Sequence, residues 1–339
     1  MTAATKPRIA LMPGDPNGVG PELAAKLLAL PETGETADVL LIADRHVLAR
    51  GARDAGTAAP ALREVATADE PFAGLAHLPV DTLDEDEVRP GEATEAGGRS
   101  VLTLLRTCLD LGRDGTIDGF MFTPLNKAAM HMAGLGHEDE MQYIRAHLGF
   151  TGPVGELNVL DRLWTSRVTS HVPLKDVVNH ITEGEILRAT RLLDGALRRA
   201  GVARPRLAAC GINPHAGDGG NFGREEIDLI APTLAKARAE GIEVDGPWPA
   251  DTIFVRARDR GDIDGIVTMY HDQGQIAMKM MGFERGVTVL GGLPIPITTP
   301  AHGTAYDIVG RGVARLDATL MAFRTLARMA DGRAGARAA

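Results

Sequence analysis

The chain has 339 residues, of which 44% are hydrophobic and 24% charged, and its formal net charge is −9. This composition excludes a mainly disordered chain, and the negative charge argues against nucleic acid or an anionic membrane as a partner. No apolar run reaches the roughly 18 residues of a membrane-spanning helix. The only cysteines, Cys108 and Cys210, exclude a multi-bridge disulfide scaffold, so we expect a cytoplasmic protein.

Apolar strand-like runs alternate with helical patterns over nearly the whole length. In chain order we expect a strand at residues 8–12, a helix at 21–30, a strand at 39–43, helices at 46–55 and 97–112, a strand at 119–123, a helix at 183–200, a strand at 206–212, a helix at 224–240, a strand at 265–270 and a helix at 316–330. Such alternation predicts parallel α/β sheets. The length predicts about two domains, which we expect to share the chain by crossing over.

A glycine-rich turn at residues 13–22 lies between the first expected strand and helix. Its backbone can approach a ligand closely, and a helix N-terminus favours an anion. The glycine spacing is not that of a dinucleotide-binding fingerprint. A tight strand-to-helix turn with no ligand explains the segment equally well.

Three of the ten histidines, His171, His215 and His271, each follow a run that reads as a strand. The carboxyl ends of parallel strands meet at the edge of a sheet where ligands bind. Three imidazoles at that edge would form a divalent-metal site with positions open for substrate. Each histidine alone is explained as well by an ordinary loop residue.

A second small-residue loop, residues 302–312, precedes the last expected helix. Its glycines would let the backbone wrap around a planar ligand, and Asp307 could accept a hydrogen bond from an adenosine hydroxyl or amine. A plain glycine-rich connection is the competing interpretation.

Together, residues 14–22 and 302–312 resemble the N-terminal turn and the adenosine-binding loop of the isocitrate/isopropylmalate dehydrogenase superfamily. Within it, the chain is most similar to the 4-hydroxythreonine-4-phosphate dehydrogenase family of pyridoxal phosphate biosynthesis. That likeness is carried by residues 169–174, 211–217, 246–252 and 269–274.

The resemblance implies two α/β/α subdomains with largely parallel sheets and an active site in the cleft between them. We expect a cofactor-side subdomain at residues 1–135 plus 282–339, and a metal, substrate and dimerisation subdomain at 136–281. It also implies an NAD-dependent homodimer with shared active sites; NADP, and Zn, Mg, Mn or Co as the metal, stay open.

Site residues follow from the same resemblance. It makes His171, His215 and His271 the metal ligands. It assigns substrate contacts to His137, Glu138, Lys279, Thr288 and Ile297, and cofactor contacts to Gly14, Asp15, His302, Gly303, Thr304, Ala305 and Asp307.

Three positions depart from the family pattern. Glu138 stands where the family usually has Thr, Thr288 where it has Asn, and Ile297 where it has Arg. An Arg fork is the usual partner of a phosphate or carboxylate, and Ile cannot replace it. The departures therefore leave the substrate open.

The expected reaction is oxidation of a secondary hydroxyl, with hydride transfer to nicotinamide. A bound metal lowers the pKa of that hydroxyl, and Lys279, Asp251 or water would remove its proton. The family reaction converts 4-phosphooxythreonine to a keto acid that decarboxylates. A 4-phosphothreonate-like sugar acid and a cis-dihydrodiol of an aromatic dicarboxylate are alternative substrates. A metal-dependent hydrolase and an inactive metal-binding relative are the competing classes.

Overall fold

The computed structural model describes residues 6–58, 61–68 and 70–338, which form two units. Unit 1 comprises Met1–Thr151 and Leu293–Ala339, and unit 2 comprises Gly152–Gly292. The chain therefore leaves unit 1 once and returns to it.

Unit 1 contains a parallel sheet in the order β3-β4-β2-β1-β5-β12. Its central strands are buried at nearly every position, as is usual when helices cover both faces of a parallel sheet. The strands are β1 (Arg8–Met12), β2 (Asp38–Ala43), β3 (Arg63–Glu64), β4 (Leu75–Pro79), β5 (Gly119–Phe122) and β12 (Ile297–Pro300).

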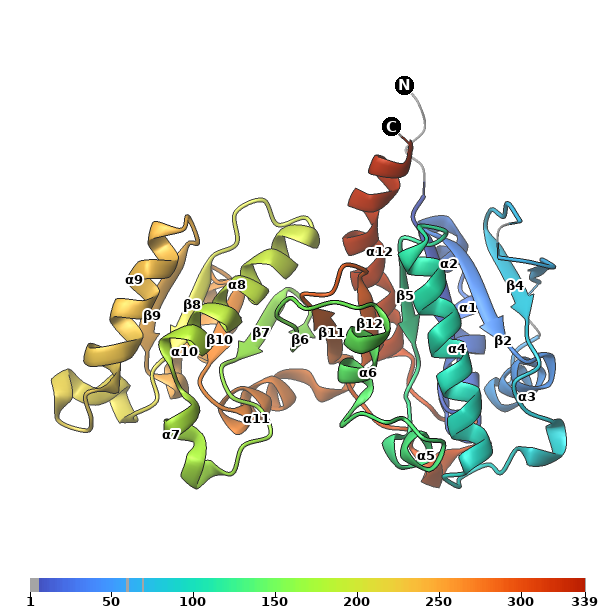
Figure 1. The fold of residues 1–339 in the computed structure, drawn as a ribbon, viewed down its shortest axis with the longest axis horizontal. Helices are drawn as coiled ribbons and strands as arrows, with labels where there is room; N and C mark the ends of the chain where they lie inside the picture. The colour runs from blue at the N-terminus through green and yellow to red at the C-terminus, as the bar shows by residue number, and fades with distance from the viewer. Residues whose placement is uncertain (1–5, 59–60, 69, 339) are drawn as a thin grey trace. The chain divides into compact units, whose positions relative to one another are not determined.

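Helices cover both faces of the unit 1 sheet. In Figure 1, α4 lies in front of these strands and α1 behind them. Helix α12 packs against β1, β5 and β12, and α1 packs against α3. The helices are α1 (Gly20–Leu28), α2 (Pro31–Thr36), α3 (Arg45–Ala55), α4 (Glu95–Arg113), α5 (Lys127–Met132), α6 (Glu140–His147) and α12 (Asp317–Ala338), with short turns η1 (Glu85–Glu87) and η6 (Tyr306–Ile308).

Unit 2 contains a mixed sheet in the order β11-β6-β7-β10-β8-β9. Strand β6 pairs antiparallel with β11 and β7, whereas β7, β10, β8 and β9 run parallel. The strands are β6 (Gly155–Leu160), β7 (Leu163–Arg167), β8 (Leu207–Cys210), β9 (Val244–Trp248), β10 (Gly265–Thr268) and β11 (Val287–Gly291).

The unit 2 helices pack in two groups. Helix α8 contacts β7 and β10 and packs against α9, while α10 and α11 share an apolar cluster with β8 and β10 that includes Ile253, Ile266 and Met278. The helices are α7 (Val177–His180), α8 (Glu183–Arg199), α9 (Ala231–Ala239), α10 (Ala250–Arg260) and α11 (His271–Gly282), with turns η2 (Leu174–Asp176), η3 (Pro214–Gly220), η4 (Glu226–Ile230) and η5 (Phe283–Arg285).

The expected α/β class with largely parallel sheets is confirmed, but the observed boundaries differ from 135/136 and 281/282. Helix α6 joins unit 1 because it packs against α4, where His147 Nε2 lies 2.9 Å from Asp110 Oδ1. Strand β11 joins unit 2 because it pairs with β6 at five positions. The helix expected at residues 224–240 divides into the π-helical turn η4 and α9. Within the described residues, no helix combines the length and apolar character needed to cross a membrane.

Candidate functional site

Two of the three expected metal ligands, His171 and His271, line one cavity in unit 2. This histidine cavity has a volume of about 600 Å³ and follows the carboxyl ends of β7 and β10. The two ring centroids lie 6.1 Å apart. Because a ring nitrogen binds zinc at about 2 Å, two imidazoles this close can serve one metal ion. The remaining lining residues are Ser170, Val172, Pro173, Leu174, Val177, Tyr270 and Asp272.

Asp272 fixes the ring of His271. Its Oδ1 atom lies 2.7 Å from His271 Nδ1. A carboxylate accepts hydrogen bonds, so this contact fits the tautomer with the proton on Nδ1, which leaves the lone pair of Nε2 for a metal. Metal-binding histidines commonly have such a carboxylate partner. The sequence reasoning gave Asp272 no role, although its place beside the histidine was a usable signal.

Gln273 connects the segments that lead to His271 and His215. Its Oε1 atom accepts the Met269 backbone N–H at 2.7 Å, and its Nε2 atom donates to the Gly211 carbonyl at 2.8 Å. These bonds join the ends of β10 and β8. The sheet edge that carries the histidines is thus held by side-chain bonds as well as by strand pairing.

His215 lies on a left-handed turn. Residues 215–219 have φ between 43° and 81°, which is unusual for the non-glycine residues His215, Ala216 and Asp218. Left-handed backbone costs an L-residue roughly 1–2 kcal/mol. A turn of this kind persists only where surrounding contacts hold it.

Buried Glu226 provides such contacts. Its Oε1 atom accepts the backbone N–H groups of Ile212 and Asn213, both at 2.8 Å. Burial alone would raise the pKa of Glu226, but the hydrogen bonds from Asn213 and Ile212 outweigh it and lower that pKa. Glu226 also packs beside the turn, since a Cβ on Gly217 would lie 2.8 Å from Glu226 Oε2.

The His215 side chain is exposed, with its ring centroid 6.3 Å from that of Phe222. Among the described residues of this single chain, no three His, Cys, Asp or Glu side chains are close enough to hold a metal ion. The structure thus brings His171 and His271 together and places His215 apart from them.

Three further expected residues lie in unit 2. Lys279 is exposed, two turns after His271 on α11. Asp251, exposed in the first turn of α10, lines a second cavity of about 420 Å³ that shares Tyr270 and Asp272 with the histidine cavity. Thr288 is half-buried on β11, opposite Asn158 of β6.

His137 and Glu138 belong to unit 1, not to the metal-side unit where the sequence placed them. Both are exposed in the loop that precedes α6. The edge of the His137 ring meets Tyr143, with centroids 5.9 Å apart. His137 is thus held by an aromatic contact.

Ile297 is fully buried on β12 of unit 1. The hydroxyl of the next residue, Thr298, donates to the Ala322 carbonyl of α12 at 3.0 Å, so Ile297 points to the opposite face of the strand. An enclosed apolar side chain offers a substrate no hydrogen bond. We therefore leave Ile297 out of the proposed site.

Gly14 and Asp15 are buried and contact protein atoms. Asp15 accepts a short hydrogen bond from the Tyr306 hydroxyl and another from the Asn17 backbone N–H at 2.9 Å. Burial is the main influence on the Asp15 carboxyl and raises its pKa, against these bonds. A Cβ on Gly14 would lie 2.3 Å from the Thr123 carbonyl oxygen. Both residues support the neighbouring loops from within.

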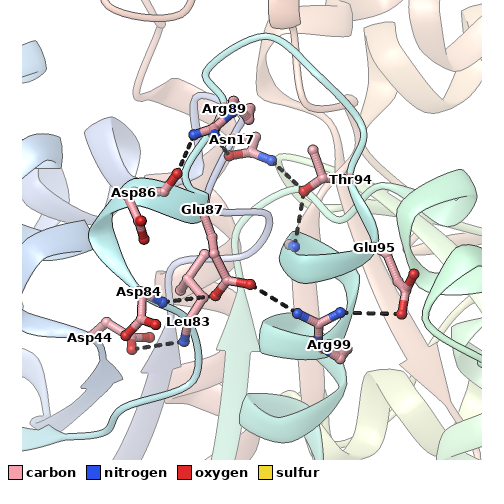
Figure 2. Close-up of polar contacts among 11 residues, drawn as sticks. Asn17, Asp44, Leu83, Asp84, Asp86, Glu87, Arg89, Thr94, Glu95 and Arg99 are labelled. Atoms are coloured by element: carbon pink, nitrogen blue, oxygen red, sulfur yellow. Dashed lines mark hydrogen bonds and ion pairs between the residues drawn. The ribbon is translucent and has the colours of Figure 1, made fainter.

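Asn17 ties the same turn to the segment before α4, as Figure 2 shows. Its Oδ1 accepts the Arg89 backbone N–H at 2.7 Å, and its Nδ2 donates to Thr94 Oγ1 at 3.0 Å. Thr94 in turn caps α4 by accepting from the Gly97 backbone N–H at 3.0 Å. The glycine-rich turn is therefore a structural junction of unit 1.

The loop at residues 302–312 is anchored to α1 and the preceding turn. The Val19 backbone N–H donates to the Thr304 carbonyl at 3.0 Å, and Lys26 Nζ donates to the carbonyls of Gly312 and Ala314 at 2.9 and 2.8 Å. Of the expected cofactor residues here, Gly303 and Asp307 are exposed, His302 and Ala305 half-buried, and Thr304 buried. An exposed carboxylate on an anchored loop is suited to bind a ribose hydroxyl or an amine.

The model of the family "Pyridoxal phosphate biosynthetic protein PdxA" matches residues 35–326. The chain belongs to the PdxA family. It is 53% identical over 332 residues to "Putative 4-hydroxythreonine-4-phosphate dehydrogenase 2" of Pseudomonas aeruginosa, covering 97% of this chain and 98% of that one.

Two more relatives show that the chain is similar to PdxA-type dehydrogenases with different named substrates. A D-threonate 4-phosphate dehydrogenase of Cupriavidus necator is 37% identical, with 97% of this chain and 98% of that protein covered. A crystal structure of 4-hydroxythreonine-4-phosphate dehydrogenase from Klebsiella pneumoniae is 33% identical, has a TM-score of 0.85, and covers 97% of this chain and 100% of that one. The chain is accordingly a PdxA-type dehydrogenase, an oxidoreductase that acts on a CH–OH group.

Proposed function

We propose that this dehydrogenase uses NAD and a divalent metal ion to oxidise a secondary hydroxyl of a phosphorylated four-carbon hydroxy acid. The observation that carries the proposal is the pair His171 and His271, which line one cavity with the second ring oriented by Asp272. An oriented pair of imidazoles suits a metal site better than it suits a plain loop.

The donor set fits a divalent metal. His171 and His271 would bind it together with His215 of a second copy, and neutral imidazoles suit Zn and other first-row divalent ions, whose affinities generally follow the order from Mn up to Cu. When bound, the metal would polarise the substrate hydroxyl and lower its pKa. Lys279 and Asp251 are the candidate bases, because both lie on helices that border the cavities of unit 2. Asp272 keeps one ring nitrogen of His271 protonated and thereby fixes the metal-binding atom.

NAD is the proposed hydride acceptor, with NADP as an outcome to test. The anchored loop carrying His302, Gly303, Thr304, Ala305 and Asp307 would hold the adenosine end. Gly14 and Asp15 would support this loop from inside the protein, since both are buried. Asp307 would repel a 2′-phosphate, which favours NAD over NADP.

The proposed substrates are two compounds that differ at carbon 2. Relatives are named for 4-hydroxythreonine 4-phosphate, which carries an amine there, and for D-threonate 4-phosphate, which carries a hydroxyl. Ile297 and Thr288 stand where the family usually has the donors Arg and Asn. Both compounds carry a phosphate and a carboxylate, so this loss removes anion contacts for either one. We propose the amine-free acid as the better substrate, and direct comparison of the two tests this choice. His137, Glu138, Lys279 and Thr288 remain the proposed substrate contacts.

We also propose a homodimer with shared active sites. The cavity lined by Asp251 exposes three apolar side chains, with Val255, Ile276 and Met280 at 47%, 62% and 84% exposure. This apolar groove adjoins the histidine cavity through Tyr270 and Asp272. A second copy docked on the groove would bring its own residues, such as exposed His215, beside His171 and His271.

NADH formation with a substrate panel tests the activity. D-threonate 4-phosphate, 4-phosphooxythreonine and an unphosphorylated cis-dihydrodiol are compared with and without Mn²⁺ after chelation. We expect metal-dependent NADH formation with a phosphorylated acid, and its loss in His171→Ala. Turnover of the dihydrodiol alone would overturn the substrate proposal, and phosphate release without NADH would indicate a hydrolase.

Size measurement in solution tests the dimer. Met280→Glu should convert a dimer into a monomer and abolish activity, while Val313→Glu, on another exposed apolar residue that belongs to unit 1, should leave the dimer intact. A fully active monomer would contradict the shared site.

A further inference from the structure

Arg167 is the centre of a polar network inside unit 2. It is the last residue of β7, and its side chain is only 8% exposed. Its Nε donates to Ser170 Oγ at 3.0 Å, its Nη1 donates to Asn158 Oδ1 at 2.8 Å, and its Nη2 forms a short ion pair with Glu156. One guanidinium thus binds three partners in three directions.

One branch of this network reaches the histidine cavity. Ser170 directly precedes His171 and lines the same cavity. The hydrogen bond from Arg167 to Ser170 therefore fixes the chain at the point where it turns from β7 toward His171. The bond lies three residues past the strand end, directly after Val168 and Thr169, whose backbone N–H groups still donate to the carbonyls of Thr268 and Met269 at 2.8 and 3.1 Å.

The other branch reaches the helix that begins at His271. Gln275, one turn along α11, donates its Nε2 to Asn158 Oδ1 at 2.6 Å. That oxygen also accepts from Arg167, so Asn158 joins the two side chains. Lys279 lies one further turn along the helix, and Thr288 is the strand partner of Asn158 on β11.

If Arg167 served only to form a structural ion pair, Glu156 would be the one partner that it required. One of the two remaining bonds of Arg167 runs to Ser170, beside His171. The other runs to Asn158 of β6, which also accepts from Gln275 of the helix that begins at His271. A planar guanidinium can donate along several directions at once, whereas a lysine ammonium acts as a point charge. The network is therefore built on a property that lysine does not share.

We propose that Arg167 is a positioning residue that sets the His171 segment and helix α11 in one register, so that the two imidazoles face the same metal ion and Lys279 is aligned with it. The inference rests on the proposed function, because it assumes that these histidines bind a metal. It assigns Arg167 no contact with substrate. Ser170, Asn158 and Gln275 act as its intermediaries.

The test measures affinity for Mn²⁺ and Co²⁺ by titration, together with KM for the accepted substrate. Arg167→Lys keeps the charge and loses the fork, so we expect metal affinity to fall about tenfold, the lower end of the loss for an orienting partner. Gln275→Leu should act in the same direction. Combined with Arg167→Lys it should add less than its own effect, because both changes break one network.

The matched control is Arg206→Lys. Arg206 also forms a forked pair, in which its Nη2 and Nε donate to the two carboxylate oxygens of Asp264 at 2.8 and 3.0 Å. Arg206 directly precedes β8 and Asp264 directly precedes β10, so the pair lies at the opposite strand ends from the histidines. Its replacement should leave metal affinity unchanged. If Arg167→Lys lowers the melting temperature strongly, the double variant Glu156→Met with Arg167→Met removes both charges together and should still lose metal affinity.

The outcomes separate the inference from the function beneath it. If the unaltered chain binds neither metal, the proposed metal site fails and the inference fails with it. If the unaltered chain binds metal, His171→Ala abolishes binding and Arg167→Lys binds normally, the inference alone is overturned. A selective loss in Arg167→Lys and Gln275→Leu, with Arg206→Lys unaffected, supports it.

Discussion

Both carboxylate oxygens of Glu226 accept hydrogen bonds from Asn213, Oε1 from its backbone N–H at 2.8 Å and Oε2 from its side-chain amide at 3.0 Å. Asn213 immediately precedes the left-handed turn that carries His215. Glu226→Gln would place an amide donor against these donors and should lower the free energy of unfolding by about 1–2 kcal/mol at neutral pH.

The same variant has a defined pH dependence. Because the folded-state pKa of Glu226 is lowered, its contribution is present above its ordinary pKa and is lost as pH falls through the folded-state value. The difference between Glu226→Gln and the unaltered protein should therefore shrink below about pH 4. Denaturant unfolding across pH measures it. Glu240→Gln, at an exposed pair with Arg191, is the control, and an equal effect there would contradict the prediction.

Removal of the carboxylate beside His271 should weaken metal binding without unfolding the protein. Asp272→Ala leaves His271 Nδ1 without its 2.7 Å partner, so the ring loses its fixed orientation. We expect metal affinity to fall about ten- to a hundredfold. Asp259→Ala, which removes an exposed carboxylate paired with Arg258, should leave affinity unchanged. Equal affinity in both variants would show that Asp272 does not orient the ring.

Tyr306→Phe should raise KM for NAD more than it lowers kcat. The variant leaves the buried Asp15 carboxylate without its hydroxyl donor and releases one anchor of the loop at residues 302–312. An unpaired buried acceptor costs about 1–3 kcal/mol of stability. Steady-state kinetics and thermal unfolding measure the two effects, with Tyr143→Phe as the comparison. An unchanged KM for NAD would separate this loop from cofactor binding.

Two glycines with nearly equal φ angles should respond very differently to alanine. Gly14 has φ +65° and would place a Cβ 2.3 Å from the Thr123 carbonyl oxygen, whereas Gly56 has φ +64° and would meet nothing within 4 Å. Gly56→Ala should lower the free energy of unfolding by about 1–2 kcal/mol, because the left-handed backbone is the one feature there that opposes an alanine side chain. Gly14→Ala should cost clearly more, and equal melting temperatures would contradict this view.

Strands of the buried parallel sheet could be predicted from sequence because both of their faces are apolar. The strand expected at residues 8–12 is β1, and the one expected at 39–43 is β2 with one added residue. Strand β6 was missed, although it alternates Glu156, Leu157, Asn158 and Val159, and the strand expected before His171 ends earlier, at Arg167 of β7. That period of two was a usable signal. Its polar side turned out to carry the Arg167 network.

From the sequence, the site residues that could be predicted are the histidines that directly follow expected strands. His171 and His271 share a cavity because β7 and β10 are neighbours with their carboxyl ends together. No local pattern indicates that Glu226 folds back onto Asn213, or that Gln275 meets Asn158 across more than a hundred residues. Those contacts depend on packing between elements. The burial of Ile297 on β12 could not be predicted for the same reason, because it is a property of the folded unit.

The return of the chain to unit 1 also sets an order of events on the ribosome. Unit 2 is complete once Gly292 has emerged, and its first and last strands, β6 and β11, already pair with each other. At that moment unit 1 still lacks β12 and α12, and the apolar surface of β5 that they cover is open. Domains generally fold as units during synthesis. Unit 2 can therefore fold first, while unit 1 depends on the last 47 residues, Leu293–Ala339, to complete its sheet.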